Sequence, residues 1–288
     1  MKCFYHDGDF DGICSGAIVK DRYPECELIG IDYGYPFPWA SLSDPLETVF
    51  MVDFSLSISE MITLNELVDL RFIDHHKSII EKVKKSGVKF KGMLRIGKGA
   101  CALTWEYFYG PEGDPDGHPV SILYISEHDV WDHSDPNTWP FQYGLGSVES
   151  ALDPEDPIWP ELFYGGKRNE IIELGKAIQS YVLSDYKKYA DDNSFEVTWE
   201  GLNFIAINRL NVGSQVLDSV FNPSKHDACL VFGWYAKIGE WKVSIFNHGF
   251  KEELDLSKIA EKHGGGGHKN AAGFQCAKLP FELKRKVG

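Results

Sequence analysis

The sequence lacks three features that would place the chain in a membrane or outside the cytoplasm. Its six cysteines include no C-x-x-C pair, and the N-terminus turns polar at His6. No apolar run reaches the roughly eighteen residues that a membrane-spanning helix needs. These absences argue against a disulfide framework, a spanning helix and a secretion signal. We therefore expect a cytoplasmic protein without a membrane partner, whose cysteines are mostly buried small apolar residues.

Basic residues are also scarce. The chain has 29 Lys and Arg against 43 Asp and Glu, which gives a formal net charge of −14. Proteins that track long nucleic acids usually carry a basic surface, because phosphate neutralisation dominates their affinity. The acidic balance disfavours such partners and suits a site that binds cations. Short single-stranded nucleic acids, nucleotides and other small phosphorylated compounds fit this charge best.

The chain is rich in residues that build a core, since 43% are hydrophobic and 14% aromatic. Its 288 residues fit two compact domains. In the first half, apolar strand-like runs alternate with helical stretches, which predicts an α/β fold with a parallel sheet and helices on both faces. The predicted strands are Lys2–His6, Glu27–Tyr33, Thr48–Phe54 and Leu70–His75. The predicted helices are Ile13–Arg22, Ser57–Leu67, Ser78–Ser86, a stretch ending at Tyr109 and one over about 119–126.

The second half has a different pattern. Asn169–Tyr189 has helical periodicity and predicts a long connecting helix, and short strands follow it. These strands are predicted at 195–199, 203–207, 228–236 and 241–246, with a helix and a glycine-rich ending after them. Composition predicts a loop over 110–118 and an irregular surface over 134–160.

Histidines and aspartates gather at the ends of three predicted strands. The segment His6–Gly12 follows the first strand, Asp53 the third and Asp74-His75-His76 the fourth. In open parallel sheets ligands bind beyond the carboxyl ends of the strands, so we expect the three groups to meet at one edge. A single Asp after a strand is usually a cap or turn residue, but three such groups favour a metal site.

The types of side chain indicate which metals such a site would bind. Crowded carboxylates raise each other's pKa values unless a cation compensates them. The imidazoles favour transition-type divalent ions, so we expect two divalent cations, with Mn²⁺ ahead of Mg²⁺ or Co²⁺. Asp9 and Asp11 would lie on one face of an extended segment. Two ions about 3.5–4 Å apart would activate a water and neutralise charge on a phosphoryl group.

These residues resemble the motifs of the DHH family of phosphoesterases, which is named for Asp-His-His, here Asp74-His75-His76. The first motif is matched by His6-x-x-Asp9-x-Asp11-Gly12, the second by Asp53, and the fourth by Asp129 within Glu127–Trp131. The run Gly264–Gly273 is similar to the signature of the DHH-associated C-terminal domain. Five motifs in the family's order make the resemblance specific.

The resemblance implies a role for each residue. One cation would be held by His6, Asp9 and Asp53, and the other by Asp11, Asp53, His75 and Asp129. Asp74 would orient His75, and His76 would face the substrate phosphate, so that both serve catalysis. Asp7 is an alternative to Asp9, and Asp132 an alternative to Asp129. The implied segments are a catalytic domain over 1–150, a linker with the connecting helix over 151–192 and a substrate-binding domain over 193–288.

The glycine-rich run has its own physical logic. Gly265, Gly266 and Gly267 would let backbone N–H groups approach an anion, with His268 beside them, although composition alone also allows a flexible helix end. The resemblance implies that this loop binds a phosphate or terminal nucleotide across a cleft between the domains. Many members of the family carry an Arg on the preceding strand. Because Ser244–His248 contains none, we expect Arg209, Asn247 or His248 to bind substrate in its place.

We predict a metal-dependent phosphoesterase that degrades short oligoribonucleotides or linear dinucleotides to mononucleotides, as an exonuclease of the oligoribonuclease type. The same centre would serve a cyclic dinucleotide, 3′-phosphoadenosine 5′-phosphate or polyphosphate. A nucleotide-binding module without catalysis is the alternative from another class. Trp131 would be either core packing or a stacking surface for a base. The sequence leaves the oligomeric state open, a homodimer included.

Overall fold

The computed structural model describes residues 1–42, 44–110, 117–248, 251 and 253–283. Residue contacts divide the chain into two compact units, Met1–Gln179 and Ser180–Gly288. This division reports contacts alone, so the three segments assigned from the resemblance stay a prediction. Most of the predicted loop over 110–118 lies outside the described residues. Within the described part of the chain, no helix is both long and apolar enough to cross a membrane.

The first unit is built on a five-stranded sheet in which every strand pairing is parallel. The strands are β1 (Lys2–His6), β2 (Glu27–Ile31), β3 (Thr48–Val52), β4 (Asp69–Asp74) and β5 (Lys91–Leu94). Their order is β2-β1-β3-β4-β5, so the three strands expected to carry site residues are neighbours. The predicted parallel sheet is confirmed, and β5 is a strand that the sequence pattern did not reveal.

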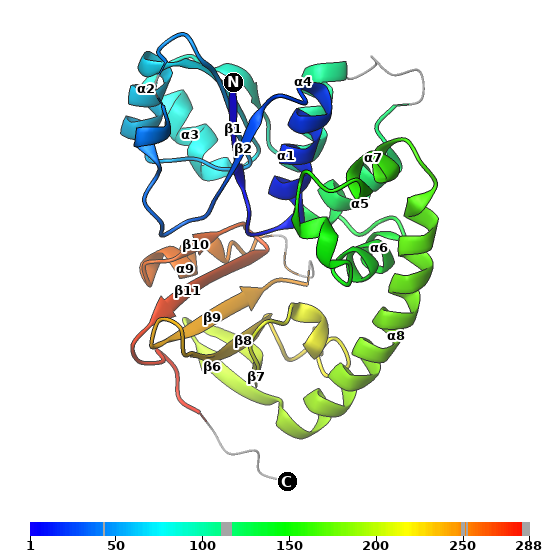
Figure 1. Ribbon diagram of the computed structural model, residues 1–288. Coiled ribbons are helices and arrows are strands. Elements are labelled where there is room, and N and C mark those ends of the chain that lie inside the picture. Colours follow the sequence, from blue (N-terminus) through cyan, green and yellow to red (C-terminus); the bar gives the residue numbers. More distant parts are fainter. Residues whose placement is uncertain (43, 111–116, 249–250, 252, 284–288) are drawn as a thin grey trace. The chain divides into compact units, whose positions relative to one another are not determined.

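Helices cover both faces of this sheet (Figure 1). They are α1 (Phe10–Arg22) and α4 (Ala100–Tyr109) on one face, and α2 (Ile58–Leu67) and α3 (Lys77–Ser86) on the other. Successive strand side chains point to opposite faces, so alternate residues join different cores. Phe4 and Met51 pack with the α2 and α3 side chains, whereas their neighbours Cys3 and Phe50 pack with α1 and α4.

The region predicted as irregular surface over 134–160 is largely helical, so that prediction was wrong. It contains α6 (Thr138–Leu145), a 3-10 turn and the start of α7 (Ile158–Phe163), and it buries Phe141 and Trp159. Two of the prolines that suggested irregular structure, Pro140 and Pro160, lie in the first turns of α6 and α7, and Pro157 is the N-cap of α7, where proline costs no backbone hydrogen bond. The preceding α5 (Val120–Asp129) ends at a predicted metal ligand, and α8 (Lys167–Asn193) is the predicted connecting helix.

The second unit contains a six-stranded mixed sheet in the order β10-β11-β9-β8-β7-β6. The strands are β6 (Phe195–Trp199), β7 (Leu202–Asn208), β8 (Ala228–Tyr235), β9 (Glu240–Phe246), β10 (Gly266–Gly267) and β11 (Ala271–Cys276). Only the β7–β8 pairing is parallel among these described strands. The helix α9 (Ser257–Lys262) packs on one face, and Ala190 of α8 packs on the other. The predicted second α/β domain is confirmed.

Candidate metal centre

The carboxyl ends of β1, β3 and β4 bring the predicted ligands together. His6 ends β1, Asp53 follows β3 directly and Asp74 ends β4. The register pairs Tyr5 with Val52 and Val52 with Ile73, so these three positions lie side by side. Their side chains and those of nearby residues form three overlapping groups that could each hold a metal ion. The groups are His6, Asp9 and Asp53; Asp11, His75 and Asp129; and Asp53, His75 and His76.

The first group is built where β1 turns into α1. His6 Nδ1 lies 3.1 Å from Asp9 Oδ2 and 3.8 Å from Asp53 Oδ2. Asp9 is the N-cap of α1, and its Oδ1 accepts a hydrogen bond of 3.0 Å from the Gly12 backbone N–H. A Cβ on Gly12 would lie 2.1 Å from the His6 carbonyl oxygen, so only glycine allows the helix to start this close to the strand.

The second group joins residues from three elements. His75 Nε2 lies 3.1 Å from Asp129 Oδ2, 3.4 Å from Asp53 Oδ1 and 3.6 Å from Asp11 Oδ2. Asp11 lies in the first turn of α1, so its predicted place on an extended segment was wrong. Its carboxylate accepts hydrogen bonds from Ala100 N (2.6 Å) and Cys101 N (2.8 Å) at the N-terminus of α4. A helix N-terminus is a favourable place for a negative charge, and here it fixes the carboxylate.

Asp53 is common to the two groups. Its Oδ1 faces His75 and its Oδ2 faces His6, and the side chain is 1% exposed. Its backbone has a φ of 54°, in the left-handed region that non-glycine residues rarely adopt. Strained backbone of this kind persists where the surrounding structure enforces it, often at functional sites. The geometry makes Asp53 the residue that could bridge two ions.

Electrostatics in this cluster are dominated by burial and by mutual contact. Burial and the charge of Asp53 raise the pKa of Asp11 well above its ordinary value. Burial raises the pKa of Asp129 to about 7, although the charge of His75 opposes it. Burial lowers the pKa of His6, but its contacts with the carboxylates of Asp53 and Asp9 outweigh this and raise the pKa to about 11. Without a metal ion, the carboxylates therefore keep the imidazoles protonated. A bound cation would replace these protons.

Buried polar atoms in the cluster also indicate that it is suited to binding cations. His6 Nδ1, Asp53 Oδ1 and Asp129 Oδ2 are buried and make no hydrogen bond within the part of the chain that the structure describes. Buried polar atoms without partners are costly and rare in native proteins, and a bound ion is one of the explanations. Within each group the potential ligand atoms lie within 4.8 Å of one another. The mixed imidazole and carboxylate donors suit divalent cations.

Asp74 contacts His76 in this structure. Its Oδ1 accepts a hydrogen bond of 2.9 Å from the His76 backbone N–H and lies 2.8 Å from His76 Nδ1. The resemblance had assigned Asp74 to His75, and that role stays a prediction. Burial lowers the pKa of His76, but the hydrogen bond and charge of Asp74 outweigh this and raise the pKa to about 9. The His76 imidazole is therefore protonated near neutral pH and can donate from both nitrogens.

The two alternatives left open by the sequence differ in position. Asp9 and Asp129 belong to the groups described above, whereas Asp7 and Asp132 belong to none of those found among the described residues. Asp132 Oδ1 instead accepts a hydrogen bond from the Ser134 backbone N–H. We therefore keep Asp9 and Asp129 as the proposed ligands.

Sequence reasoning missed Asp32, which follows β2. Its Oδ1 lies 3.2 Å from His6 Nε2 and accepts a hydrogen bond of 2.7 Å from the Tyr33 backbone N–H. Asp32 thus holds one ring nitrogen of His6 while the other faces Asp9 and Asp53. Carboxylates commonly orient metal-binding histidines in this way. Its position directly after an apolar strand, like that of Asp53, was the signal that could have found it.

Replacing Asp32 by Ala should weaken divalent-metal binding, because the His6 ring would lose the contact that fixes its orientation. Loss of such a contact typically costs about ten- to a hundredfold in metal affinity. Titration calorimetry with Mn²⁺ would measure the change. Asp192→Ala, at an exposed position on α8, is the matched control. Equal affinities for the two variants would show that His6 does not depend on Asp32.

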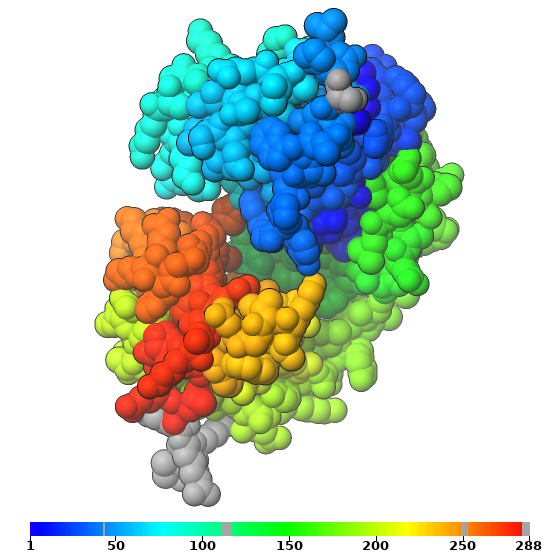
Figure 2. Space-filling model, turned by 60° about the vertical axis from the view of Figure 1, so that its left-hand side comes forward, coloured from blue at the N-terminus to red at the C-terminus, as the bar shows by residue number. Residues whose placement is uncertain are grey.

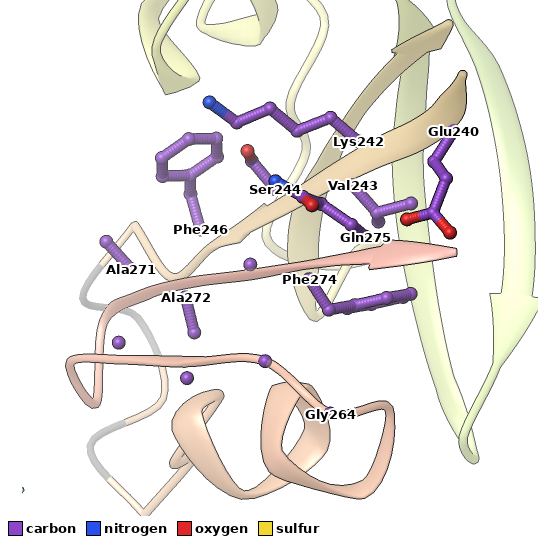
Figure 3. A pocket seen from close by; sticks show the side chains of 14 residues that line it. Glu240, Lys242, Val243, Ser244, Phe246, Gly264, Ala271, Ala272, Phe274 and Gln275 are labelled. Carbon is purple, nitrogen blue, oxygen red and sulfur yellow. The ribbon is translucent and has the colours of Figure 1, made fainter. Parts of the chain in front are cut away.

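In the second unit, three of the predicted substrate-binding residues line a pocket and three do not. Gly265, Gly266 and Gly267 line a pocket of about 740 Å³, together with residues of β9 and β11 such as Ser244 and Phe274 (Figure 3). A Cβ on Gly265 would lie 2.1 Å from the Gly273 carbonyl oxygen, so this run packs closely on β11. The sequence-predicted glycines therefore surround one cavity.

The other three predicted residues do not line that pocket. Arg209 pairs with Asp185 at 2.9 Å and lies over the rings of Tyr186 and Tyr189. Asn247 is buried and donates a hydrogen bond of 2.9 Å to the Lys251 carbonyl oxygen. His268 lies in the turn between β10 and β11, where its backbone N–H bonds to the Ala271 carbonyl oxygen. Their roles in substrate binding stay predictions.

Comparison with known proteins shows the fold. No protein-family model matches the chain. The uncharacterized protein R106 of Acanthamoeba polyphaga mimivirus is 24% identical over 254 residues, which are 82% of this chain. The chain spans about half the length of that relative, 56% of it.

Two solved structures are similar to the chain over most of its length. A pGpG-specific phosphodiesterase from Vibrio cholerae has a TM-score of 0.55 at 11% identity, over 95% of this chain and 92% of that one. An exopolyphosphatase-related protein from Bacteroides fragilis has a TM-score of 0.53 at 14% identity, over 96% and 87%. At these identities the likeness establishes a shared fold, and the chemistry must be argued from the residues.

Proposed function

We propose that this chain, which has the fold of the DHH phosphoesterases with their associated C-terminal domain, is a metal-dependent phosphoesterase acting on phosphodiester bonds of short oligonucleotides or dinucleotides. The observation that carries the proposal is the pair of His–carboxylate groups that share Asp53 at the carboxyl edge of the parallel sheet. Such an edge is where open α/β sheets bind their ligands.

Two divalent cations would be held by these residues. One would be bound by His6, Asp9 and Asp53, and the other by Asp11, Asp53, His75 and Asp129. When bound, such a pair supplies an activated water and neutralises the charge that develops on a transferring phosphoryl group. The chain contributes fixed ligand positions, since Asp11 is anchored by the α4 N-terminus and His6 by Asp32.

His76 is proposed to act on the substrate itself. Its side chain is 28% exposed, in contrast to the buried His75, and its Nδ1 is directed at Asp74. Asp74 keeps the imidazole protonated, so His76 would donate from Nε2 to a phosphoryl or leaving-group oxygen. General acids placed in this way typically contribute about a hundred- to ten-thousandfold to a rate. Asp74 would serve catalysis by positioning His76.

The substrate class rests on charge and on pocket chemistry. A net charge of −14 penalises long polyanions and leaves short substrates, whose few charges the cations can neutralise. The Gly265–Gly267 run lines a pocket of a size suited to a nucleotide, and its role in binding phosphate rests on the resemblance, since the Gly265 and His268 backbone N–H groups donate to the Ala260 and Ala271 carbonyl oxygens. The similar Vibrio cholerae structure is that of a phosphodiesterase for pGpG, a linear dinucleotide, which supports this class at the level of fold.

The test is a panel of di- to pentanucleotides and longer oligonucleotides, assayed for mononucleotide release with Mn²⁺ and with EDTA. We expect Mn²⁺-dependent turnover that is fastest on the shortest substrates and falls with length. Cyclic dinucleotides, 3′-phosphoadenosine 5′-phosphate and polyphosphate belong in the same panel. Preferential turnover of one of these compounds would show a phosphoesterase with a different substrate. Silence on all of them, with metal shown to be bound, would overturn the enzymatic proposal.

A further inference from the structure

A second pocket lies in the first unit, beside the metal centre. It has a volume of about 560 Å³, within the range of small-molecule sites. Its walls come from the end of β2, from the loop that follows it, and from single residues after β1 and β3. The lining residues are Asp7, Ile29, Gly30, Ile31, Asp32, Tyr35, Pro36, Phe37, Pro38 and Phe54. None of the proposed metal ligands is among them, although Phe54 directly follows Asp53.

Aromatic rings and prolines make this pocket flat-walled and pre-formed. The buried Phe54 is stacked with Tyr33 at a centroid distance of 4.5 Å. Phe37 is held between Phe4 at 4.7 Å and Trp39 at 4.9 Å. Prolines on both sides of Phe37 restrict the loop backbone. Tyr35 also lines the pocket and is 64% exposed. The N-terminal residues, to which this loop belongs, are coloured blue in Figure 2.

Two carboxylates provide the polar part of the pocket. Asp7 and Asp32 follow the paired strands β1 and β2, whose last register pair is His6 with Ile31. A Cβ on Gly30 would lie 2.9 Å from Asp7 Oδ2, so the absence of a side chain there leaves room for the Asp7 carboxylate. Asp32 contacts His6 at 3.2 Å and so connects the pocket to the metal centre. The lining contains no Lys or Arg, which makes the pocket unsuitable for phosphate and suitable for a group with hydrogen-bond donors.

We propose that this pocket binds the guanine base of a nucleotide whose phosphate lies at the metal centre, an inference that rests on the proposed phosphoesterase function. Guanine carries adjacent hydrogen-bond donors at N1–H and N2–H₂. The two oxygens of one carboxylate can accept both hydrogen bonds. Adenine presents an acceptor at N1, and it would be repelled there by the lone pairs of a carboxylate. The aromatic rings would stack on the base, and this stacking stabilises any nucleobase because each has a π-face. Selectivity therefore comes from the carboxylates and affinity from the rings.

Equilibrium binding of nucleosides tests the pocket apart from catalysis and metal. We expect guanosine to bind the full chain in EDTA about tenfold more tightly than adenosine, the scale of one good bidentate contact. Asp7→Asn replaces an acceptor by an amide and should remove that preference, because the amide N–H₂ opposes the guanine donors. Asp192→Asn, exposed on α8, should retain it. No nucleoside binding, equal binding of the two nucleosides, or an unchanged preference in Asp7→Asn would overturn the proposal.

Measurements of turnover distinguish a failure of the proposed guanine pocket from a failure of the proposed phosphoesterase function. With Mn²⁺, GpG should be cleaved about tenfold more efficiently than ApA, and Asp7→Asn should lower that ratio to near one. A dinucleotide backbone without bases should be cleaved equally by the native chain and by Asp7→Asn. Equal cleavage of GpG and ApA by the native chain would reject the guanine pocket and leave the phosphoesterase standing. Selective guanosine binding without any cleavage would reject the phosphoesterase and leave the pocket standing.

Discussion

Replacing Asp53 by Asn is expected to slow hydrolysis about a thousandfold or more and to reduce the number of bound metal ions. Asp53 faces both His6 and His75 from the centre of the cluster, so one substitution damages both proposed ion sites. Removing a single preorganised electrostatic group typically lowers a rate by about a hundred- to a thousandfold. Because Asp53 serves two sites, we expect a loss at the upper end of that range or beyond.

Asn is the suitable replacement, because the backbone at this position has a positive φ of 54°. Asn tolerates the left-handed region better than most residues, so the variant should retain the fold while it loses one negative oxygen. The measurements are kcat/KM on a dinucleotide and the metal equivalents retained after dialysis. Asp132→Asn is the matched control, since Asp132 lies near Asp129 in sequence and outside the three groups. An active Asp53→Asn that binds two ions would refute the shared-ligand arrangement.

The fold could be predicted from the sequence wherever local pattern and tertiary environment agree. Strands β1 and β3 have apolar interiors, Cys3–Tyr5 and Val49–Val52, because both faces of the sheet are covered by helices. The same reasoning failed at β5, whose sequence Lys-Gly-Met-Leu is short and partly exposed. Gly92 is required there by packing, since a Cβ would lie 2.0 Å from the Phe72 carbonyl oxygen. Such a close approach of two strands leaves no periodic signal in the sequence.

Some features of the metal centre could likewise be predicted from the sequence, and others could not. The meeting of His6, Asp53 and the Asp74–His76 segment follows from strand order, and strand ends can be recognised from hydrophobic runs. The anchoring of Asp11 at the α4 N-terminus, 89 residues away along the chain, depends on how two helices pack. The contact of Asp74 with His76 depends on side-chain geometry. Neither could be obtained from spacing in the sequence.

Metal affinity is expected to rise steeply with pH. In the absence of metal, burial lowers the pKa of His75, but contact with the Asp53 carboxylate and the charges of nearby aspartates outweigh this and raise it to about 10. The pKa of His6 is about 11. Below these values both imidazoles carry protons, and a metal ion can bind only the neutral form. At least two protons, one from each imidazole, must therefore leave when both sites fill. Each released proton makes the apparent affinity about tenfold stronger per pH unit, so two protons give about a hundredfold.

Metal affinity increases with pH because the pKa values of His6 and His75 are both raised. A raised pKa means that protons compete with the metal up to alkaline pH, so affinity increases across the neutral range and levels off only above the pKa of His6. Titration calorimetry with Mn²⁺, in two buffers of different ionisation enthalpy, would count the protons released. His6→Gln should release about one proton fewer. His133→Gln should release the native number, because burial lowers the pKa of His133 and this ring is already neutral. A heat of binding that does not depend on the buffer would show that the metal-free imidazoles are neutral and that the carboxylates do not hold protons on them.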